Sequence, residues 1–219
     1  MSTTTLSCEV LIIGSGSAGL RAAIEAHDAG SQVLIVSKNR KGDPHTVLAR
    51  GGINAALGTM DPNDNWLVHA ADTLREGGFI ANYEKVAVLC KNASNVINEL
   101  AGCGARFHKE EDGRLTQRFF GAHTYRRTCF YGDWTGKEII RVFMDQVRKI
   151  RIIDNLYVMN LLRSGDLGTG EEVKIMGALC MDIKKKCAIT FKSNYVILAA
   201  GGYSRVYIPS SSRIFENYG

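Results

Sequence analysis

The N-terminal part of the chain alternates short apolar runs with polar and glycine-rich joints. One apolar run ends the segment 8–13, another ends the segment 32–36, and an alanine-rich stretch fills 20–29 between them. Short apolar runs next to turn residues are typical of buried strands, and the alanine-rich stretch favours a helix. The pattern predicts a strand, a helix and a second strand, which is the order of a parallel β-α-β unit.

The middle of the chain has helical spacing. Apolar residues recur three and four positions apart over 63–76 and 83–101, and glycines follow both segments. Another helix is predicted over 137–149, so 63–149 is expected to form a helical flank. Within this flank, the segment 114–128 carries charged and aromatic residues that follow neither the helical nor the strand periodicity. This predicts an ordered functional loop.

The last third has the pattern of strands. Segments 152–162, 173–183 and 188–192 predict a β-meander over 152–192, and an apolar strand that returns over 195–202 ends in glycines. A meander of this kind is typical of an insertion beside a doubly wound sheet. We therefore expect one α/β domain over 1–219.

Composition limits the classes of protein. The 219 residues are 45% hydrophobic and 22% charged, as in ordinary soluble proteins, and the longest apolar runs are too short to cross a bilayer. The first residues resemble no secretory signal, so a cytoplasmic location without direct membrane insertion is expected. The six cysteines form no C-x-x-C pair, which predicts no metal site. The net charge of +5 comes partly from lysine clusters without interleaved aromatics, which argues against nucleic acid as a partner.

A glycine-rich turn follows the first predicted strand. In this motif Gly14 allows a tight turn, Gly16 leaves room for a pyrophosphate, and Gly19 lets the helix and strand pack closely. The N–H groups at the start of the helix add a site for phosphate. The whole motif, with its order of strand, turn and helix, predicts dinucleotide binding by Gly14, Ser15, Gly16, Ser17, Ala18 and Gly19.

The end of the second strand departs from the pattern of NAD-binding proteins. Ser37 and Lys38 stand where an acidic residue usually binds the ribose. A serine hydroxyl can still bind a ribose oxygen, so the departure weakens the NAD hypothesis but not dinucleotide binding. A solvated strand end is the alternative for Ser37.

A nucleophilic ring precedes a glycine pair in the stretch HTVLARGGINAAL. Here His45 and Thr46 come shortly before Gly51 and Gly52, which allow the backbone to approach a flat ligand closely.

The sequence resembles the flavoprotein subunit of succinate dehydrogenase and fumarate reductase, a family that also includes the L-aspartate oxidases. The resemblance rests on GSGSAG, Ser37-Lys38, HTVLARGGINAAL, DNWLVHAADTL, DGRLTQRFFGAHTYRRTCFYGDWTG, ILAAGG and SSSRIFENYG, in the expected order. It implies a Rossmann-like FAD-binding domain of an enzyme that interconverts succinate and fumarate by hydride transfer to or from the flavin, in the tricarboxylic acid cycle or electron transport.

The resemblance also assigns roles to residues. It implies that His45 is joined covalently to the flavin, and that Thr46, Gly51 and Gly52 lie against its ring. It also places Phe120 near the substrate, with a core aromatic as the alternative for this residue. The returning strand ends at Ala200 and Gly201, which are expected to contact the cofactor. The capping domain that clamps the dicarboxylate has no counterpart, so no catalytic residue is assigned with assurance and the chain is expected to be a fragment.

Three hypotheses follow. The chain belongs to a succinate dehydrogenase or fumarate reductase flavoprotein, whose partner is an iron–sulfur subunit in a membrane-associated complex. Alternatively, it belongs to an aspartate oxidase or another FAD-dependent dehydrogenase, although His45 weighs against the oxidase. The third hypothesis is a non-catalytic FAD-binding fragment.

Overall fold

The computed structural model describes residues 4–165, 172–203 and 206. It divides into two compact units, which are considered separately: unit 1 comprises 1–46 and 143–219, and unit 2 comprises 47–142. The helices are α1 (Ser17–Asp28), α2 (Trp66–Glu76), α3 (Tyr83–Gly102) and α4 (Thr135–Gln146), with 3-10 turns η1 (His45–Leu48) and η2 (Val147–Lys149). The strands are β1 (Thr4–Ile13), β2 (Val33–Val36), β3 (Ile53–Asn54), β4 (Gln117–Arg118), β5 (Thr128–Cys129), β6 (Arg151–Ile153), β7 (Leu156–Ser164), β8 (Lys174–Asp182) and β9 (Cys187–Leu198).

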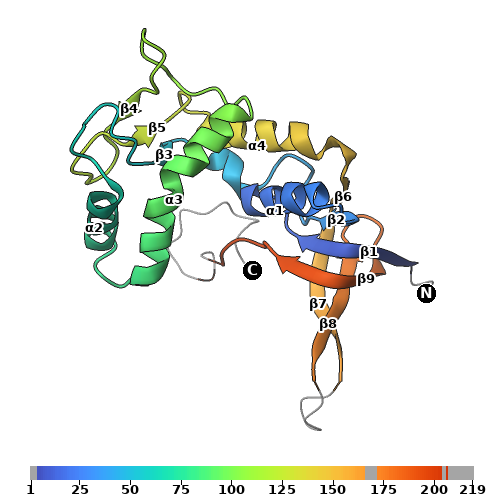
Figure 1. Cartoon of the computed structure of the whole chain (residues 1–219). Helices are drawn as coiled ribbons and strands as arrows, with labels where there is room; N and C mark the ends of the chain where they lie inside the picture. Colours follow the sequence, from blue (N-terminus) through green and yellow to red (C-terminus); the bar gives the residue numbers. More distant parts are fainter. Residues whose placement is uncertain (1–3, 166–171, 204–205, 207–219) are drawn as a thin grey trace. The chain divides into compact units, whose positions relative to one another are not determined.

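Unit 1 is built on a sheet of mixed direction (Figure 1). In the described residues its strand order is β6-β2-β1-β9-β8-β7. β6, β2, β1 and β9 are parallel, whereas β8 and β7 are antiparallel to their neighbours. The predicted α/β class and the initial β-α-β unit are confirmed.

The apolar pattern of β1 and β2 explains why both faces of the parallel part are covered. Leu11 and Leu34 belong to a cluster with Phe191 and other buried residues of β7, β8 and β9. Successive strand residues point to opposite faces, so Ile12 and Ile35 face the other side, where α1 packs. Figure 1 shows β7 and β8 running steeply across the direction of β1 and β9.

The meander differs from the sequence-based prediction in two ways. The predicted strand 152–162 is divided into β6 and β7 at Asn155, whose φ of 59° lies in the left-handed region. The predicted break between 192 and 195 does not exist, because β9 runs unbroken and Ser193 pairs with Cys8 of β1. The meander and the returning strand therefore share one strand, and the meander extends the main sheet.

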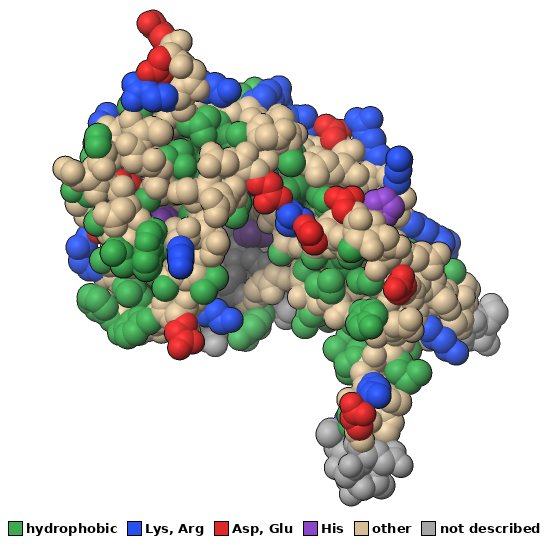
Figure 2. Space-filling view, in the orientation of Figure 1, with side chains coloured by type: hydrophobic (Ala, Val, Ile, Leu, Met, Phe, Trp, Pro, Cys, Tyr) green, Lys and Arg blue, Asp and Glu red, His purple; other side chains and the backbone are tan. Residues whose placement is uncertain are grey.

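Unit 2 contains a helix pair. The side chain of Asn65 accepts hydrogen bonds from the N–H groups of Leu67 and Val68 at the start of α2, and that of Asn82 accepts one at the start of α3. The two helices share a small core of Ala70, Val86 and Cys90. Figure 2 shows hydrophobic side chains gathered at this end of unit 2 and outside that core. The exposed large hydrophobic residues of α2, α3 and the segment between them are Trp66, Leu67, Phe79, Ile80, Tyr83, Val88, Leu89 and Val96.

Unit 2 also contains a small antiparallel sheet with the order β3-β5-β4. Gln117 and Arg118 of β4 pair with Cys129 and Thr128 of β5, which in turn pair with β3. The predicted irregular loop 114–128 is therefore partly strand, although each strand is too short to show an alternating pattern.

No helix within the described residues combines the length and the apolar character needed to span a membrane.

Candidate functional site

The turn after β1 packs closely against its surroundings. Gly14 has a φ of 114°, and a methyl group there would collide with the carbonyl of Ala199. A methyl group on Gly19 would collide in the same way with the carbonyl of Gly14. These two glycines are therefore required by the contacts between β1, α1 and the end of β9.

Gly16 is different, because its surroundings leave space. A Cβ atom added to Gly16 would lie 3.6 Å from Oγ1 of Thr46 and 4.0 Å from Cβ of Pro44, which are ordinary contacts. The fold itself therefore tolerates a methyl group here. The space in front of Gly16 is consistent with the predicted approach of a pyrophosphate.

The N-terminus of α1 faces the same region. Its first backbone hydrogen bond runs from the N–H of Leu20 to the carbonyl of Gly16, and Oγ1 of Thr46 accepts a hydrogen bond from the N–H of Ser17 at 3.3 Å. The N–H groups of Ala18 and Gly19 precede the first intrahelical bond and are available to an anion. No acidic side chain lies in the first turn, so the positive end of the helix dipole can favour phosphate.

Ser37 is held by a second hydroxyl group. The Oγ atoms of Ser15 and Ser37 lie 2.7 Å apart, and both residues are buried. One hydroxyl must donate to the other, so the second keeps its proton for another acceptor. Ser37 is thus a buried polar residue at the cavity and not a solvated strand end.

These residues surround one cavity of about 330 Å³, which is within the size range of small-molecule sites. All its lining residues belong to unit 1. Of the predicted site residues it brings together Gly14, Ser15, Gly16, Ser37, Lys38, His45, Thr46, Ala200 and Gly201. Ser17, Ala18 and Gly19 follow directly in α1.

One wall of the cavity was missed by sequence reasoning. Residues 156–161 of β7 line it, and among them Tyr157, Met159 and Leu161 remain substantially exposed. Large apolar side chains on an exposed strand offer a surface for a flat aromatic group. The alternate apolar residues of this strand were visible in the sequence, but nothing local indicated that they would face the glycine turn.

Gly51, Gly52 and Phe120 belong to unit 2 and are not among the residues that line this cavity. A Cβ atom on Gly51 would lie 2.6 Å from the ring of Phe120. At Gly52, where φ is 121°, it would lie 2.5 Å from the carbonyl oxygen of Cys129. The structure brings these three predicted residues together, and packing within unit 2 requires a glycine at Gly52, whereas the neighbour of Gly51 is the end of a side-chain ring that can move.

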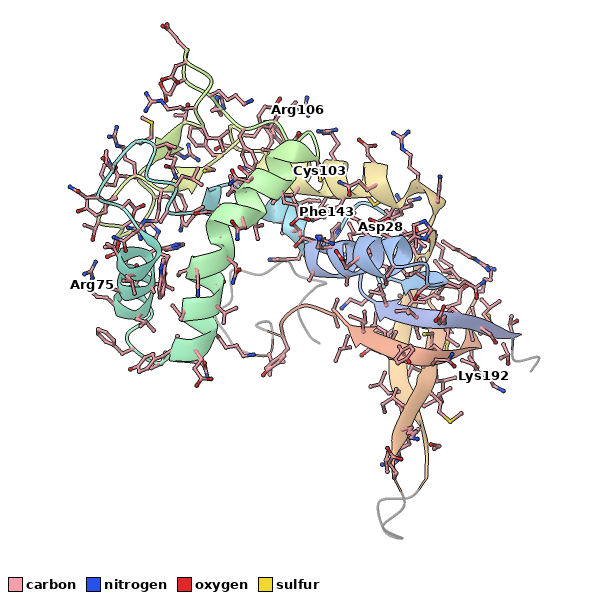
Figure 3. All side chains as sticks on the ribbon, in the orientation of Figure 1. Asp28, Arg75, Cys103, Arg106, Phe143 and Lys192 are labelled. Carbon is pink, nitrogen blue, oxygen red and sulfur yellow. The ribbon has the colours of Figure 1, made fainter. Side chains whose placement is uncertain are left out.

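Unit 2 has a buried ionic centre that the sequence did not reveal. The guanidinium of Arg127 is fully buried and lies 2.8 Å from a carboxylate oxygen of Asp64 and 3.0 Å from one of Asp72. Asp72 also bonds Thr124 and Arg75, which is labelled on α2 in Figure 3. These contacts tie α2 to the loops before it and before β5, which is a structural role.

His69 lies within this ionic centre. Burial, together with the positive charge of Arg127, lowers the pKa of His69 from 6.5 to about 4. Burial and Arg127 also lower the pKa of His123, whose ring centroid is 6.1 Å from that of His69. Both rings are therefore neutral near pH 7.

A second carboxylate of unit 2 is held by arginines. Glu138 of α4 accepts hydrogen bonds from Arg106 and Arg141; Figure 3 shows Arg106 just beyond the C-terminal end of α3. Burial by itself raises the pKa of Glu138, but the hydrogen bonds from Arg141 and Arg106 outweigh it and bring the pKa to about 2. This contact fixes the segment after α3 and is not part of the cavity.

The cavity combines three kinds of contact. The helix N-terminus suits phosphate, the hydroxyl pair suits a sugar, and the β7 wall suits a flat base. No group of three or more potential metal ligands occurs in the part of the chain that the structure describes. The residues present therefore fit a dinucleotide.

The chain is similar to known proteins over nearly its whole length. The family described as "FAD binding domain" matches residues 9–217. A fumarate reductase (CoM/CoB) subunit of Methanothermobacter marburgensis is 39% identical over 222 residues, covering 100% of this chain and 39% of that protein. The succinate dehydrogenase flavoprotein subunit of Rickettsia bellii is 32% identical, covering 93% of this chain and 35% of that protein.

A solved structure is also similar. The structure described as Mycobacterium smegmatis Sdh1 in complex with UQ1 has a TM-score of 0.87 at 34% identity, and the match covers 98% of this chain and 37% of that one. The chain thus spans 35–39% of the length of these relatives.

Proposed function

The chain belongs to the FAD binding domain family, and from this premise we propose that its cavity holds the ADP half of FAD. The observation that carries the proposal is one cavity that is lined by the glycine turn, Ser37, Lys38 and His45 together. The N–H groups of Ala18 and Gly19 would bind the pyrophosphate, and the hydroxyl pair of Ser15 and Ser37 would bind the ribose. The wall of β7 would pack against the adenine.

Bound FAD would supply two-electron redox chemistry. The chain is similar in sequence to the FAD-binding part of succinate dehydrogenase and fumarate reductase flavoproteins. We propose that it serves the same reaction, the interconversion of succinate and fumarate, as part of a longer flavoprotein or together with a second chain. The proposed electron partner is the iron–sulfur subunit of a membrane-associated complex, and a peripheral position on the cytoplasmic face is the proposed location.

His45 is the proposed site of flavin attachment. It begins the turn η1 and lines the cavity next to Thr46, whose hydroxyl is fixed by Ser17 at the start of α1. This contact supports the proposal because it limits the position of the segment that carries the imidazole. An imidazole nitrogen is a competent nucleophile for this attachment.

The ring end of the flavin is assigned to residues of unit 2. We propose that Gly51 and Gly52 lie against the isoalloxazine ring, and that Phe120 lies near the dicarboxylate. The ring of Phe120 lies against Gly51, the neighbour of Gly52, which supports a shared role for the three residues.

Flavin attachment can be tested on a denaturing gel. The chain is incubated with FAD, denatured with acid and run beside His45→Ser and, as a matched control, His27→Ser on the exposed side of α1. The proposal predicts flavin fluorescence in the protein band of the wild type and of His27→Ser, but not of His45→Ser.

The other outcomes separate the alternatives. FAD that binds but is released by acid from all three proteins would favour an aspartate oxidase or another FAD-dependent dehydrogenase. A folded wild-type chain that takes up no FAD would contradict the proposed function.

A further inference from the structure

Arg118 makes two well-defined contacts within unit 2. Its Nη2 atom donates a hydrogen bond to the carbonyl oxygen of Gly51 at 2.9 Å. Its guanidinium carbon lies 4.0 Å from the centroid of the Phe130 ring, which is a cation–π contact. The pairing of Arg118 with Thr128 fixes the backbone from which the side chain extends.

The two residues that flank the Gly51–Gly52 peptide are closely packed at the positions where side chains would project. The ring of Phe120 occupies the position of a side chain on Gly51, and the carbonyl of Cys129 occupies that of a side chain on Gly52. A backbone confined in this way can still rotate its peptide plane, because no side chain opposes the rotation. The hydrogen bond from Arg118 is the contact that fixes the plane.

Fixing the carbonyl also fixes the neighbouring amide. In a planar trans peptide the C=O of Gly51 and the N–H of Gly52 point to opposite sides. With the carbonyl held by Arg118, the N–H of Gly52 points away from the guanidinium. A positively charged donor makes the stronger kind of hydrogen bond, and it polarises the peptide so that this N–H becomes a better donor.

We propose that Arg118 is a positioning residue that turns the N–H of Gly52 toward the isoalloxazine ring of bound FAD. The inference rests on the proposed function, which assigns Gly51 and Gly52 to the flavin. A fixed N–H donor stabilises the electron-rich reduced ring without reorganisation. Arg118 therefore raises the reduction potential of the flavin through the peptide and does not itself contact the substrate.

The Nε atom of Arg118 argues against a role in packing alone. It is buried and has no hydrogen-bond partner among the described residues. A buried donor without a partner costs about 1–3 kcal/mol, so a residue needed only to cover Phe130 would be better as an uncharged one. The role of the guanidinium is therefore its hydrogen bond to the carbonyl of Gly51.

The first experiment uses the protein without FAD. Labelling with 1-13C-glycine and 15N-glycine selects the Gly–Gly peptides at 51–52, 77–78 and 201–202 in an HNCO spectrum. Arg118→Met should shift both the carbonyl carbon and the amide resonance of the 51–52 signal, whereas Arg118→Lys should keep most of the wild-type shift. Arg126→Gln, which removes the neighbouring ion pair with Asp61, is the matched control and should change neither. An unchanged 51–52 signal in folded Arg118→Met would overturn the proposal.

The second experiment measures the reduction potential of bound FAD. For Arg118→Met we expect about a tenfold lower ratio of reduced to oxidised flavin at fixed potential, which is a shift of about −30 mV for a two-electron couple. Arg118→Lys should recover part of the shift, and Arg126→Gln should show none. An unchanged potential in Arg118→Met with FAD bound would refute this inference alone, whereas a failure of the wild type to bind FAD would refute the proposed function.

Discussion

Glycines in this chain serve different purposes. The atoms that an added methyl group would meet at each position distinguish them. Gly14 and Gly19 allow backbone segments to touch, whereas Gly16 borders open space in the cavity. The sequence motif predicted all three roles, because a strand, a glycine turn and a helix are local features. The role of Gly51 and Gly52 was only partly predictable, since their contacts come from Phe120 and Cys129, far along the chain.

Alanine substitutions should separate these two glycines. Gly52→Ala places a methyl group 2.5 Å from a backbone carbonyl at a φ of 121°, so we expect a loss of about 3 kcal/mol or more in the free energy of unfolding. Gly51→Ala meets only the end of the half-exposed Phe120 ring, which can move, so less than about 1 kcal/mol is expected. Urea unfolding followed by tryptophan fluorescence measures both, because Trp66 and Trp134 lie in unit 2. Equal losses would contradict this description of the glycine pair.

The buried ring of His69 should make unit 2 sensitive to acid. Its pKa is about 4 when folded and 6.5 when unfolded, so the unfolded chain binds the extra proton between these values and stability falls as the pH decreases through this range. The full effect is roughly 3 kcal/mol at 1.36 kcal/mol per pKa unit, and about half of it should be lost between pH 7 and pH 5. Unfolding in urea at the two pH values checks this.

A neutral variant provides the comparison for His69. His69→Gln should show a smaller loss on acidification, whereas His27→Gln on the surface should behave as the wild type does. An identical pH dependence for His69→Gln and the wild type would show that other groups are responsible.

At the scale of elements, long-range contacts determine the length of β9 and the position of β7, which local sequence patterns did not predict. The predicted strands 188–192 and 195–202 left Ser193 and Asn194 between them, yet β9 continues through these residues because β1 supplies a parallel partner. Likewise, β7 was predicted as a strand, but its place beside the glycine turn depends on the cluster that packs the meander on the parallel sheet. Local chemistry predicted the elements, and only their packing determined which of them form the cavity.

Arg127 connects several elements of unit 2, and its loss should be costly. Arg127→Met leaves the buried carboxylates of Asp64 and Asp72 without their shared partner, so a loss of about 3–5 kcal/mol in unfolding free energy is expected. The adjacent Arg126 pairs with the more exposed Asp61, and Arg126→Met should cost less than about 1 kcal/mol. Urea unfolding of the two variants, monitored by tryptophan fluorescence, tests the contrast; similar losses would argue against Arg127 as a structural centre.

At the scale of the whole molecule, the proposed cofactor concerns both units. The cavity lies in unit 1, whereas the residues proposed for the flavin ring lie in unit 2. The chain spans 39% of the length of the Methanothermobacter relative, so the complete reaction is proposed for a larger assembly. What this chain can be tested for by itself is the binding of FAD.

A ligand that contacts both units should stabilise both. At a free FAD concentration one hundred times the dissociation constant, mass action adds about 2.7 kcal/mol to the stability of the state that binds. Tryptophan fluorescence reports on unit 2 alone, so a higher unfolding midpoint by this probe indicates that FAD reaches unit 2. FAD bound with no change in this midpoint would confine the ligand to unit 1.

The most direct test of the central claim is calorimetric titration of FAD into the wild type and Gly16→Ala. The added methyl group makes only ordinary contacts in the protein, so unfolding should be unchanged, but it occupies the space assigned to the pyrophosphate. We expect the wild type to bind FAD in competition with ADP, and Gly16→Ala to bind at least tenfold more weakly, or about 1.4 kcal/mol. Gly102→Ala, at an open position at the end of α3, is the matched control and should bind as the wild type does. Equal affinities for the wild type and Gly16→Ala, or no binding by the folded wild type, would contradict the account.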